Sequence, residues 1–222
     1  MADKTVKSTY TTAAFRLSYP ALFEPVAVMG DATKMKYSVT MLFPKKSISE
    51  ALKAQKHPAT TWLPTDNCAG LYQEIVKIAR ANFGPEVDLK TLKLPKFRDG
   101  DKPKERTGQV DDNEKGYIVL HSTSNTRPDV LRGDKTRITA AEASEVYPGC
   151  WVRAVLTVSP FVHKVGGRGV TIYLGGIQKL ADDTTFSSRP RSEDAFDAVA
   201  SGEGASAAPT AIPAGDKDPW EA

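Results

Sequence analysis

The segment from residue 151 to residue 174 constrains the fold more than any other part of the chain. Residues 151–159 read WVRAVLTVS, in which Val152, Ala154, Leu156 and Val158 alternate with the residues between them. A spacing of two is typical of a β-strand with one buried face. Residues 163–169 read HKVGGRG, and a second apolar run follows at 170–174. Because glycine adopts the positive φ angles of hairpin turns, the segment is predicted to form a hairpin with a basic tip.

The rest of the chain predicts further short strands with two helices inserted between them. Alternation predicts strands over 15–19, 34–43 and 117–121, ended in the first two cases by prolines 20 and 44. Apolar spacing and capping residues predict helices over 47–56 and 68–83. Residues 89–116 are polar and irregular. Within this segment we expect residues 94–116 to be mobile in the free protein and to close over bound DNA. The pattern favours a mainly β fold, an OB-fold five-stranded barrel with helical and loop insertions.

Charge is divided unequally along the chain. Residues 181–222 hold nine acidic and three basic side chains, so the net charge of +3 for the whole chain leaves +9 on residues 1–180. A basic body is typical of a polyanion-binding domain, although a soluble protein with a solvated acidic end fits the charge equally well. Large apolar residues become rare from residue 187 onward, which predicts a disordered acidic tail. We expect a flexible N-terminus over 1–11, an OB-fold domain over 12–186 and the tail over 187–222.

Cysteine and histidine content argues against a metal centre. Cys68 and Cys150 are the only cysteines, neither lies in a C-x-x-C pair, and the chain has three histidines. We therefore expect no zinc site and no cofactor, and two reduced thiols in a cytosolic protein. The sequence shows no apolar run of about 18 residues, so no membrane association is expected.

Motifs of common enzyme classes are missing from the sequence, and we expect no catalytic activity. Phosphate-binding loops, nucleophile elbows and H-E-x-x-H pairs do not occur. One enzymatic alternative rests on Asp99, Asp101, Asp111 and Asp112, which could hold Mg²⁺ in a metal-dependent nuclease. These carboxylates lie in a segment rich in lysine and glycine, which is more typical of a solvated loop.

Aromatic and basic residues are interleaved on the predicted strands, as in proteins that stack bases and track phosphates. The candidate stacking residues are Tyr117, Trp151, Phe161 and Tyr173, and the candidate phosphate contacts are Lys34, Lys36, Arg98, Arg153, Lys164 and Arg168. Burial in the core is the alternative for each aromatic residue taken singly. Trp151 is the strongest stacking candidate because alternation places it on the same face as Arg153, and we expect Arg98 to anchor a phosphate from the long loop.

Four segments resemble a family of single-stranded DNA-binding proteins from tailed bacteriophages. They are FRDGD at 97–101, YPGCWVRA at 147–154, GRGV at 167–170 and LGGIQK at 174–179. The resemblance implies an OB-fold and an acidic C-terminus that ends near an aromatic residue. At the C-terminus it assigns partner binding to Asp216, Asp218, Trp220 and Glu221. This chain departs from the pattern there, because Trp220 is not terminal and Lys217 interrupts the acids.

Together these features lead to one functional prediction. The protein is expected to bind and protect single-stranded DNA, without strong sequence preference, during phage DNA replication and recombination in the host cytoplasm. Its tail would recruit a phage or host polymerase, helicase or nuclease. A strand-annealing or duplex-binding recombination protein is the first alternative, and the metal-dependent nuclease is the second. The oligomeric state is left open.

Overall fold

The structure is a computed structural model that describes residues 5–28, 30–63, 68–105, 107–164 and 167–186. Residues 1–187 and residues 188–222 are two separate units, and the elements below all belong to the first. The strands are β1 (Ser8–Thr11), β2 (Phe15–Val28), β3 (Asp31–Pro44), β4 (Arg98–Asp99), β5 (Tyr117–Ser124), β6 (Asp129–Leu131), β7 (Trp151–His163) and β8 (Gly167–Ala181). The helices are α1 (Lys46–Ala54) and α2 (Ala69–Phe83), with short 3-10 turns η1 (Pro58–Trp62), η2 (Leu89–Thr91), η3 (Asp112–Glu114) and η4 (Ala140–Glu145).

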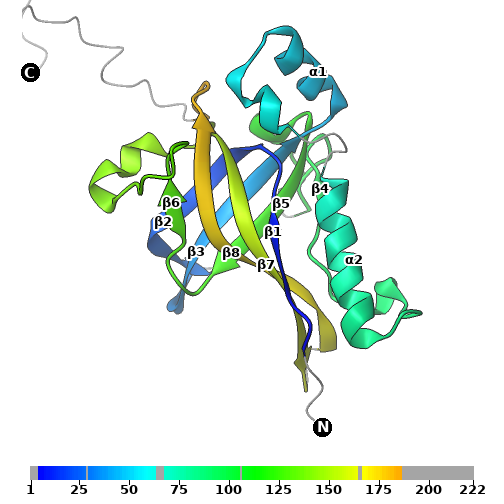
Figure 1. The fold of residues 1–222 in the computed structure, drawn as a ribbon. Coiled ribbons are helices and arrows are strands. Elements are labelled where there is room, and N and C mark those ends of the chain that lie inside the picture. The colour runs from blue at the N-terminus through cyan, green and yellow to red at the C-terminus, as the bar shows by residue number, and fades with distance from the viewer. Residues whose placement is uncertain (1–4, 29, 64–67, 106, 165–166, 187–222) are drawn as a thin grey trace, which may run out of the picture. The chain divides into compact units, whose positions relative to one another are not determined.

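Five of these strands close a barrel in the order β2, β3, β5, β8, β7 and back to β2 (Figure 1). All neighbours in the barrel are antiparallel except β5 and β8, which run parallel where Thr123 faces Tyr173. The barrel closes where Phe15 of β2 pairs with Val152 of β7. This is the strand order of an OB-fold, so the prediction of a mainly β, OB-fold barrel is confirmed.

Alternate residues of the long strands fill the barrel interior. Val152, Leu156 and Val158 of β7 are fully buried, as their spacing of two predicts. Phe15 and Phe43 pack against each other with their ring centroids 5.3 Å apart. Burial of one such side chain contributes roughly 1.5–3 kcal/mol, so this interior face is a main source of the barrel's stability.

Helix α2 lies beside the extended part of β7 and β8 (Figure 1). Leu71, Ile75 and Ile78, spaced three and four residues apart, are buried in the same core as the barrel residues. The helix ends at Gly84, whose φ of 103° suits glycine. The sequence prediction of a helix over 68–83 is therefore confirmed to within one residue. No helix in the described segments is long and apolar enough to cross a membrane.

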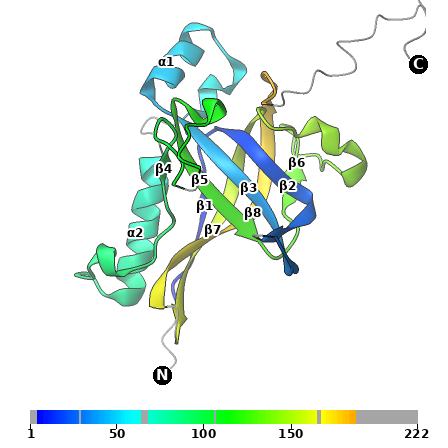
Figure 2. The same cartoon turned by 180° about the vertical axis from the view of Figure 1, so that it is seen from behind.

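Helix α1 and the turn η1 cover the outside of the barrel at its other end (Figure 2). Leu52 of α1 and Ala59 of η1 pack on Leu42, Val119 and Trp151. These three strand residues point away from the barrel interior, and α1 and η1 help to shield them from solvent. The helical insertion thus buries apolar residues on the outer surface of the sheet.

The N-terminus is more ordered than the sequence indicates. Residues 1–11 were expected to be flexible, but Ser8–Thr11 form β1, which pairs with β7 from Ser8 opposite Val158 to Thr11 opposite Val155. Four polar residues carry no apolar alternation that would predict a strand. The strand forms because β7 extends past its contact with β2 and has backbone groups that need partners.

Strand β2 also continues beyond the point where Pro20 was expected to end it. The pairing of β2 with β3 shifts register between Ser18 and Ala21 and again before Val26. Pro20 and Pro25 fall within these irregular stretches, where β2 has β3 as its only strand neighbour. Proline is tolerated at bulges and on strand edges because no ladder hydrogen bond is lost there.

Candidate nucleic-acid interface

Three residues that point away from the barrel interior line up across neighbouring strands, although Ser38 among them is only 9% exposed. Ser38 of β3 lies opposite Thr123 of β5, and Thr123 lies opposite Tyr173 of β8. The residues before and after Tyr173, Ile172 and Leu174, are buried, so alternation turns the tyrosine ring outward. The side chain of Tyr173 is 42% exposed.

Small side chains surround this ring. Thr157 of β7 and Thr123 of β5 flank it on the two neighbouring strands, and Gly175 follows two residues later on β8. Short hydroxyl side chains and a glycine leave one aromatic ring standing above a flat polar surface. Such a ring offers a face on which a base can stack, whatever the base.

The β2–β3 arm is the end of the β2–β3 hairpin over residues 26–37, which projects from the sheet in Figure 2. Lys34 and Lys36 belong to this arm. The Lys34 ammonium group lies 2.8 Å from the Asp31 carboxylate. This contact lowers the pKa of Asp31, with further help from the hydroxyl and backbone N–H of Thr33. Lys36 has no acidic partner among the described residues.

The β7–β8 arm is the long end of the β7–β8 hairpin over residues 159–172, and it lies apart from the β2–β3 arm in Figure 2. Phe161, Lys164 and Arg168 belong to it. The Phe161 ring lies 5.4 Å from the His163 ring, while the Arg168 guanidinium lies 5.5 Å from the ring of Phe83 in α2. Arg168 pairs with Val162 and Phe161 with Gly169, so Arg168 and Phe161 point to opposite faces of the hairpin.

Arg153 lies on the outer face of β7, farther along the same hairpin from Tyr173. Its guanidinium stacks 4.2 Å from the ring centre of Trp62, and its Nε donates a 2.8 Å hydrogen bond to Oε1 of Gln178. Trp62, 44% exposed, was missed by the sequence analysis. It lies in η1, where no strand or helix periodicity indicates its direction, and an aromatic residue between two prolines was the one available signal.

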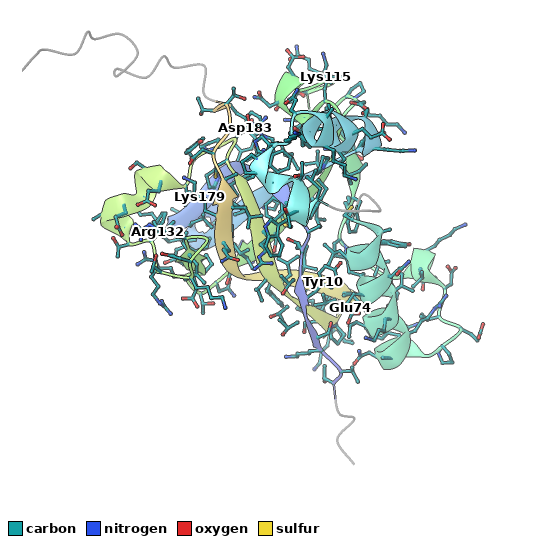
Figure 3. The ribbon with its side chains drawn as sticks, turned by 45° about the horizontal axis from the view of Figure 1, so that its top comes forward. Tyr10, Glu74, Lys115, Arg132, Lys179 and Asp183 are labelled. Carbon is teal, nitrogen blue, oxygen red and sulfur yellow. The ribbon has the colours of Figure 1, made fainter. Side chains whose placement is uncertain are left out.

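The stacking role assigned to Trp151 is wrong, because its side chain is 0% exposed. The indole Nε1 donates a 2.7 Å hydrogen bond to Asp183, and Arg16 and His57 lie against the ring. Figure 3 shows Asp183 just beyond the end of β8, at the same end of the hairpin as Lys179. The chain after β8 thus folds over the tryptophan.

The stacking role assigned to Tyr117, at the same end of the barrel, is also wrong. This residue is 7% exposed and belongs to the apolar cluster beneath α1 and η1. Burial is the main cause that raises the pKa of its hydroxyl group. Tyr117 therefore stabilises the helical insertion and offers no ring face to a base.

Arg98 is held by an internal ion pair instead of standing free for a phosphate. In β4 it pairs with the carboxylate of Glu114, which is 3% exposed and also lies 3.3 Å from Lys104. Lys104 reaches Asp111 at 2.7 Å as well. Residues 94–116 were expected to be mobile, but this network ties together the two ends of the part over 98–116 (the 98–116 loop).

The aspartates considered for a nuclease site are likewise paired with lysines. Asp99 and Asp101 both contact Lys45, and Asp112 contacts Lys115 at 2.6 Å. The hydrogen bond from Lys45 is the largest cause that lowers the pKa of Asp99 and of Asp101. Within the described segments, no group of three or more His, Cys, Asp or Glu side chains could hold a metal ion.

The candidate tail residues lie outside the described residues. They are Asp216, Asp218, Trp220 and Glu221. Five of the other candidates lie on or beside the row of Ser38, Thr123 and Tyr173. They are Lys34 and Lys36 of the β2–β3 arm, Tyr173 itself, and Phe161 and Lys164 of the β7–β8 arm. Arg153 lies on the same hairpin but apart from this row.

A family model and solved structures of known proteins are similar to this chain, and they point to the same family. A family model described as the Enterobacter phage Enc34 ssDNA-binding protein matches residues 8–206. A solved structure of the single-stranded DNA-binding protein from bacteriophage Enc34 is 26% identical, with a TM-score of 0.53 over 85% of this chain and 90% of that one. No curated protein sequence matches the chain.

Two further structures of the Enc34 protein are similar to this chain. One is its complex with ssDNA, at 25% identity and a TM-score of 0.54, covering 84% of this chain and all of that one (100%). The other is a C-terminal truncation, at 25% identity and a TM-score of 0.55, covering 84% of this chain and 99% of that one.

Proposed function

The chain belongs to the family of the Enterobacter phage Enc34 ssDNA-binding protein, and from this premise we propose that it binds and protects single-stranded DNA during phage DNA replication and recombination. The observation that carries the proposal on this chain is the exposed Tyr173 ring in the row with Ser38 and Thr123. OB-folds bind oligonucleotides on the face of their second and third strands, which are β3 and β5 in this barrel.

The two arms supply charge on either side of that face. Lys36 and Lys34 lie on the β2–β3 arm, and Lys164 lies on the β7–β8 arm. A strand that crosses from one arm to the other passes over Tyr173, which stacks a base while the lysines contact phosphates. Contacts to phosphates and ring faces do not distinguish the four bases, so binding occurs without strong sequence preference.

Protection follows from the same geometry. Bases stacked on the protein are unavailable for pairing, and phosphates held by lysines are shielded from nucleases. This role needs no catalytic group, and the aspartates of the 98–116 loop serve as ion-pair partners. We propose that the protein acts in the host cytoplasm and that its acidic tail contacts other replication proteins.

Fluorescence anisotropy with labelled oligo-dT and with a duplex of equal length tests the proposal. Single-stranded DNA should bind more tightly, and the affinity should fall steeply with salt because each neutralised phosphate releases a counterion. Lys36→Ala should reduce the salt slope by about one. Lys53→Ala on α1 removes the same charge from another part of the domain and should leave the slope unchanged. Equal affinity for duplex and single strand would contradict the proposal and favour a duplex-binding protein.

A further inference from the structure

A groove runs along the outside of the barrel beyond Tyr173. It is lined by residues of β6, β7 and β8, strands that lie toward the viewer in Figure 1. Its volume is about 540 Å³. Val155 of β7 and Gly175 and Gly176 of β8 line its floor, and Leu131 of β6 lines one side. The two glycines have no side chains to fill it. A groove of this size with an apolar floor suits a flat aromatic ligand.

Arg153 lines this groove and connects it to an aromatic ring outside the lining. Its guanidinium stacks 4.2 Å from the ring centre of Trp62, which belongs to η1. Gln178 fixes the arginine by accepting from its Nε at 2.8 Å, and the Gln178 amide donates in turn to the backbone oxygens of Arg132 and Gly133. The arginine is therefore oriented by a neutral partner and keeps its charge available.

The charge balance of the groove favours an anion. Within the described part of the chain, Arg153 contacts no carboxylate, in contrast to Arg132, whose guanidinium lies 2.6 Å from both Glu142 and Glu145. Lys135 adds a second cation to the lining. The one acidic lining residue, Asp129, is paired at 2.8 Å with Arg137.

The groove is continuous with the face assigned above to DNA. Thr157, opposite Tyr173, and Val155 and Arg153 are successive outward residues of β7, so they lie on one surface. At ~3.3 Å per residue, the distance from Thr157 to Arg153 is roughly 13 Å along the strand. A DNA strand that lies on Tyr173 can therefore continue to Trp62 without leaving this face of the hairpin.

We propose that this groove is a second subsite for the same DNA strand. A base stacks on the exposed indole of Trp62, and Arg153 contacts a neighbouring phosphate. The inference rests on the proposed function and extends the bound segment from the face of β3, β5 and β8 onto the outer face of β7 and β8.

The test is binding of oligo-dT over lengths from about 4 to about 16 nucleotides, the range of site sizes found for OB-folds. Trp62→Ala and Arg153→Ala should weaken binding of the longest oligonucleotide by at least about fivefold and affect the shortest much less. The number of nucleotides bound per protein at saturation should fall. In the Trp220→Phe protein, long oligonucleotides should quench the fluorescence of Trp62, because Trp151 is buried.

Matched variants separate this subsite from general effects on the fold. Tyr72→Ala removes an aromatic side chain of equal exposure (45%) from α2, and Arg80→Ala removes an arginine from the same helix. Neither should change DNA binding. Val155→Glu places a negative charge in the groove at an exposed strand position and should weaken the binding of long oligonucleotides. Val155→Gln adds no charge and should leave their binding unchanged.

The outcomes distinguish the two proposals. If the wild-type protein binds no oligo-dT, the proposed function fails. The other outcome is that the wild-type protein binds oligo-dT while the variants at Trp62, Arg153 and Val155 have the same affinity at every oligonucleotide length and bind the same number of nucleotides per protein. In that case the groove is not a DNA subsite and the proposed function stands.

Discussion

The indole Nε1 of Trp151 donates a hydrogen bond to Oδ2 of Asp183 across 2.7 Å. Burial opposes ionisation of this carboxyl, but the bonds from Trp151 and the Thr184 amide outweigh it and lower the pKa of Asp183. Arg16 holds the same segment in place. Its guanidinium donates a hydrogen bond to the backbone oxygen of Thr184 and stacks 4.4 Å from the centre of the Phe186 ring. The chain after β8 is thus part of the folded domain as far as Phe186.

Replacement of Asp183 by alanine should lower the free energy of unfolding by roughly 1–3 kcal/mol, because the buried indole N–H loses its acceptor. Urea denaturation followed by circular dichroism measures this difference. Asp183→Asn keeps an oxygen acceptor for the indole N–H, so its free energy of unfolding should fall less than that of Asp183→Ala. Asp112→Ala breaks an exposed pair with Lys115 and should have little effect. A loss for Asp183→Ala no larger than for Asp112→Ala would contradict the importance of this bond.

Stability at acid pH should depend on Glu142. The backbone N–H of Thr139, the Thr139 hydroxyl and Arg132 lower its pKa to about 2. The folded-state pKa lies below the unfolded value of about 4.3, so the stabilisation is present above that value and is lost as the pH falls toward 2. Glu142→Gln should therefore be less stable than wild type at neutral pH, and the difference should shrink on acidification. Thermal unfolding from about pH 7 to about pH 3 tests this, with the exposed Glu50→Gln as control.

The 98–116 loop should resist proteolysis until its ion pairs are broken. Glu114→Gln removes the buried charge that holds Arg98 and Lys104, so limited trypsin digestion should cut this loop faster than in wild type. Glu105→Gln, which alters a fully solvated carboxylate, should be cut like wild type. Because Arg98 is engaged internally, added DNA should protect the wild-type loop little. Rapid cutting of the wild-type loop that DNA prevents would restore the idea of a mobile loop that closes on DNA.

Tyr173 should contribute stacking energy to binding. Tyr173→Ala should weaken oligo-dT binding by roughly 1–3 kcal/mol, and Tyr173→Phe should retain nearly all of the affinity because the ring remains. Anisotropy titrations at fixed salt measure the change. An alanine variant that binds like wild type would move the interface away from β8.

Deletion of residues 211–222 should tighten DNA binding at low salt. These residues carry Asp216, Asp218 and Glu221, and their tethering gives them a high effective concentration near a basic surface. The effect should fade at high salt because screening weakens both interactions. A full-length chain with these three acids replaced by their amides should behave like the deletion. If neither change alters affinity at low salt, the acids do not compete with DNA.

Alternation along β7 could be predicted from the sequence because the strand obeys a local rule. It correctly placed Val152 and Leu156 on one buried face. The same rule turned Trp151 outward but gave no sign that Asp183, 32 residues later, would return to cover it. Burial by a distant segment depends on tertiary structure, which strand periodicity does not encode.

The candidate site was predictable to the same extent. Lys34 and Lys36 lie on the strand where alternation placed them, but the choice of Arg98 failed because its partner Glu114 lies across a loop without periodicity. Trp62 was missed for the related reason that a 3-10 turn between two prolines has no repeating pattern. Charge and aromatic content indicate the class of ligand more reliably than they indicate the contacting residues.

The barrel closure described above also sets the order of events during synthesis. Phe15 pairs with Val152, so β2 has β3 beside it early but must wait for 137 more residues before its second barrel partner, β7, begins to exist. At roughly 5–20 residues per second, the wait is on the order of ten seconds. Throughout that time the β2–β3 hairpin has an unpaired strand edge that can join other nascent chains. A ribosome-bound chain that ends before residue 151 therefore cannot close the barrel, and the wait lengthens when elongation is slow.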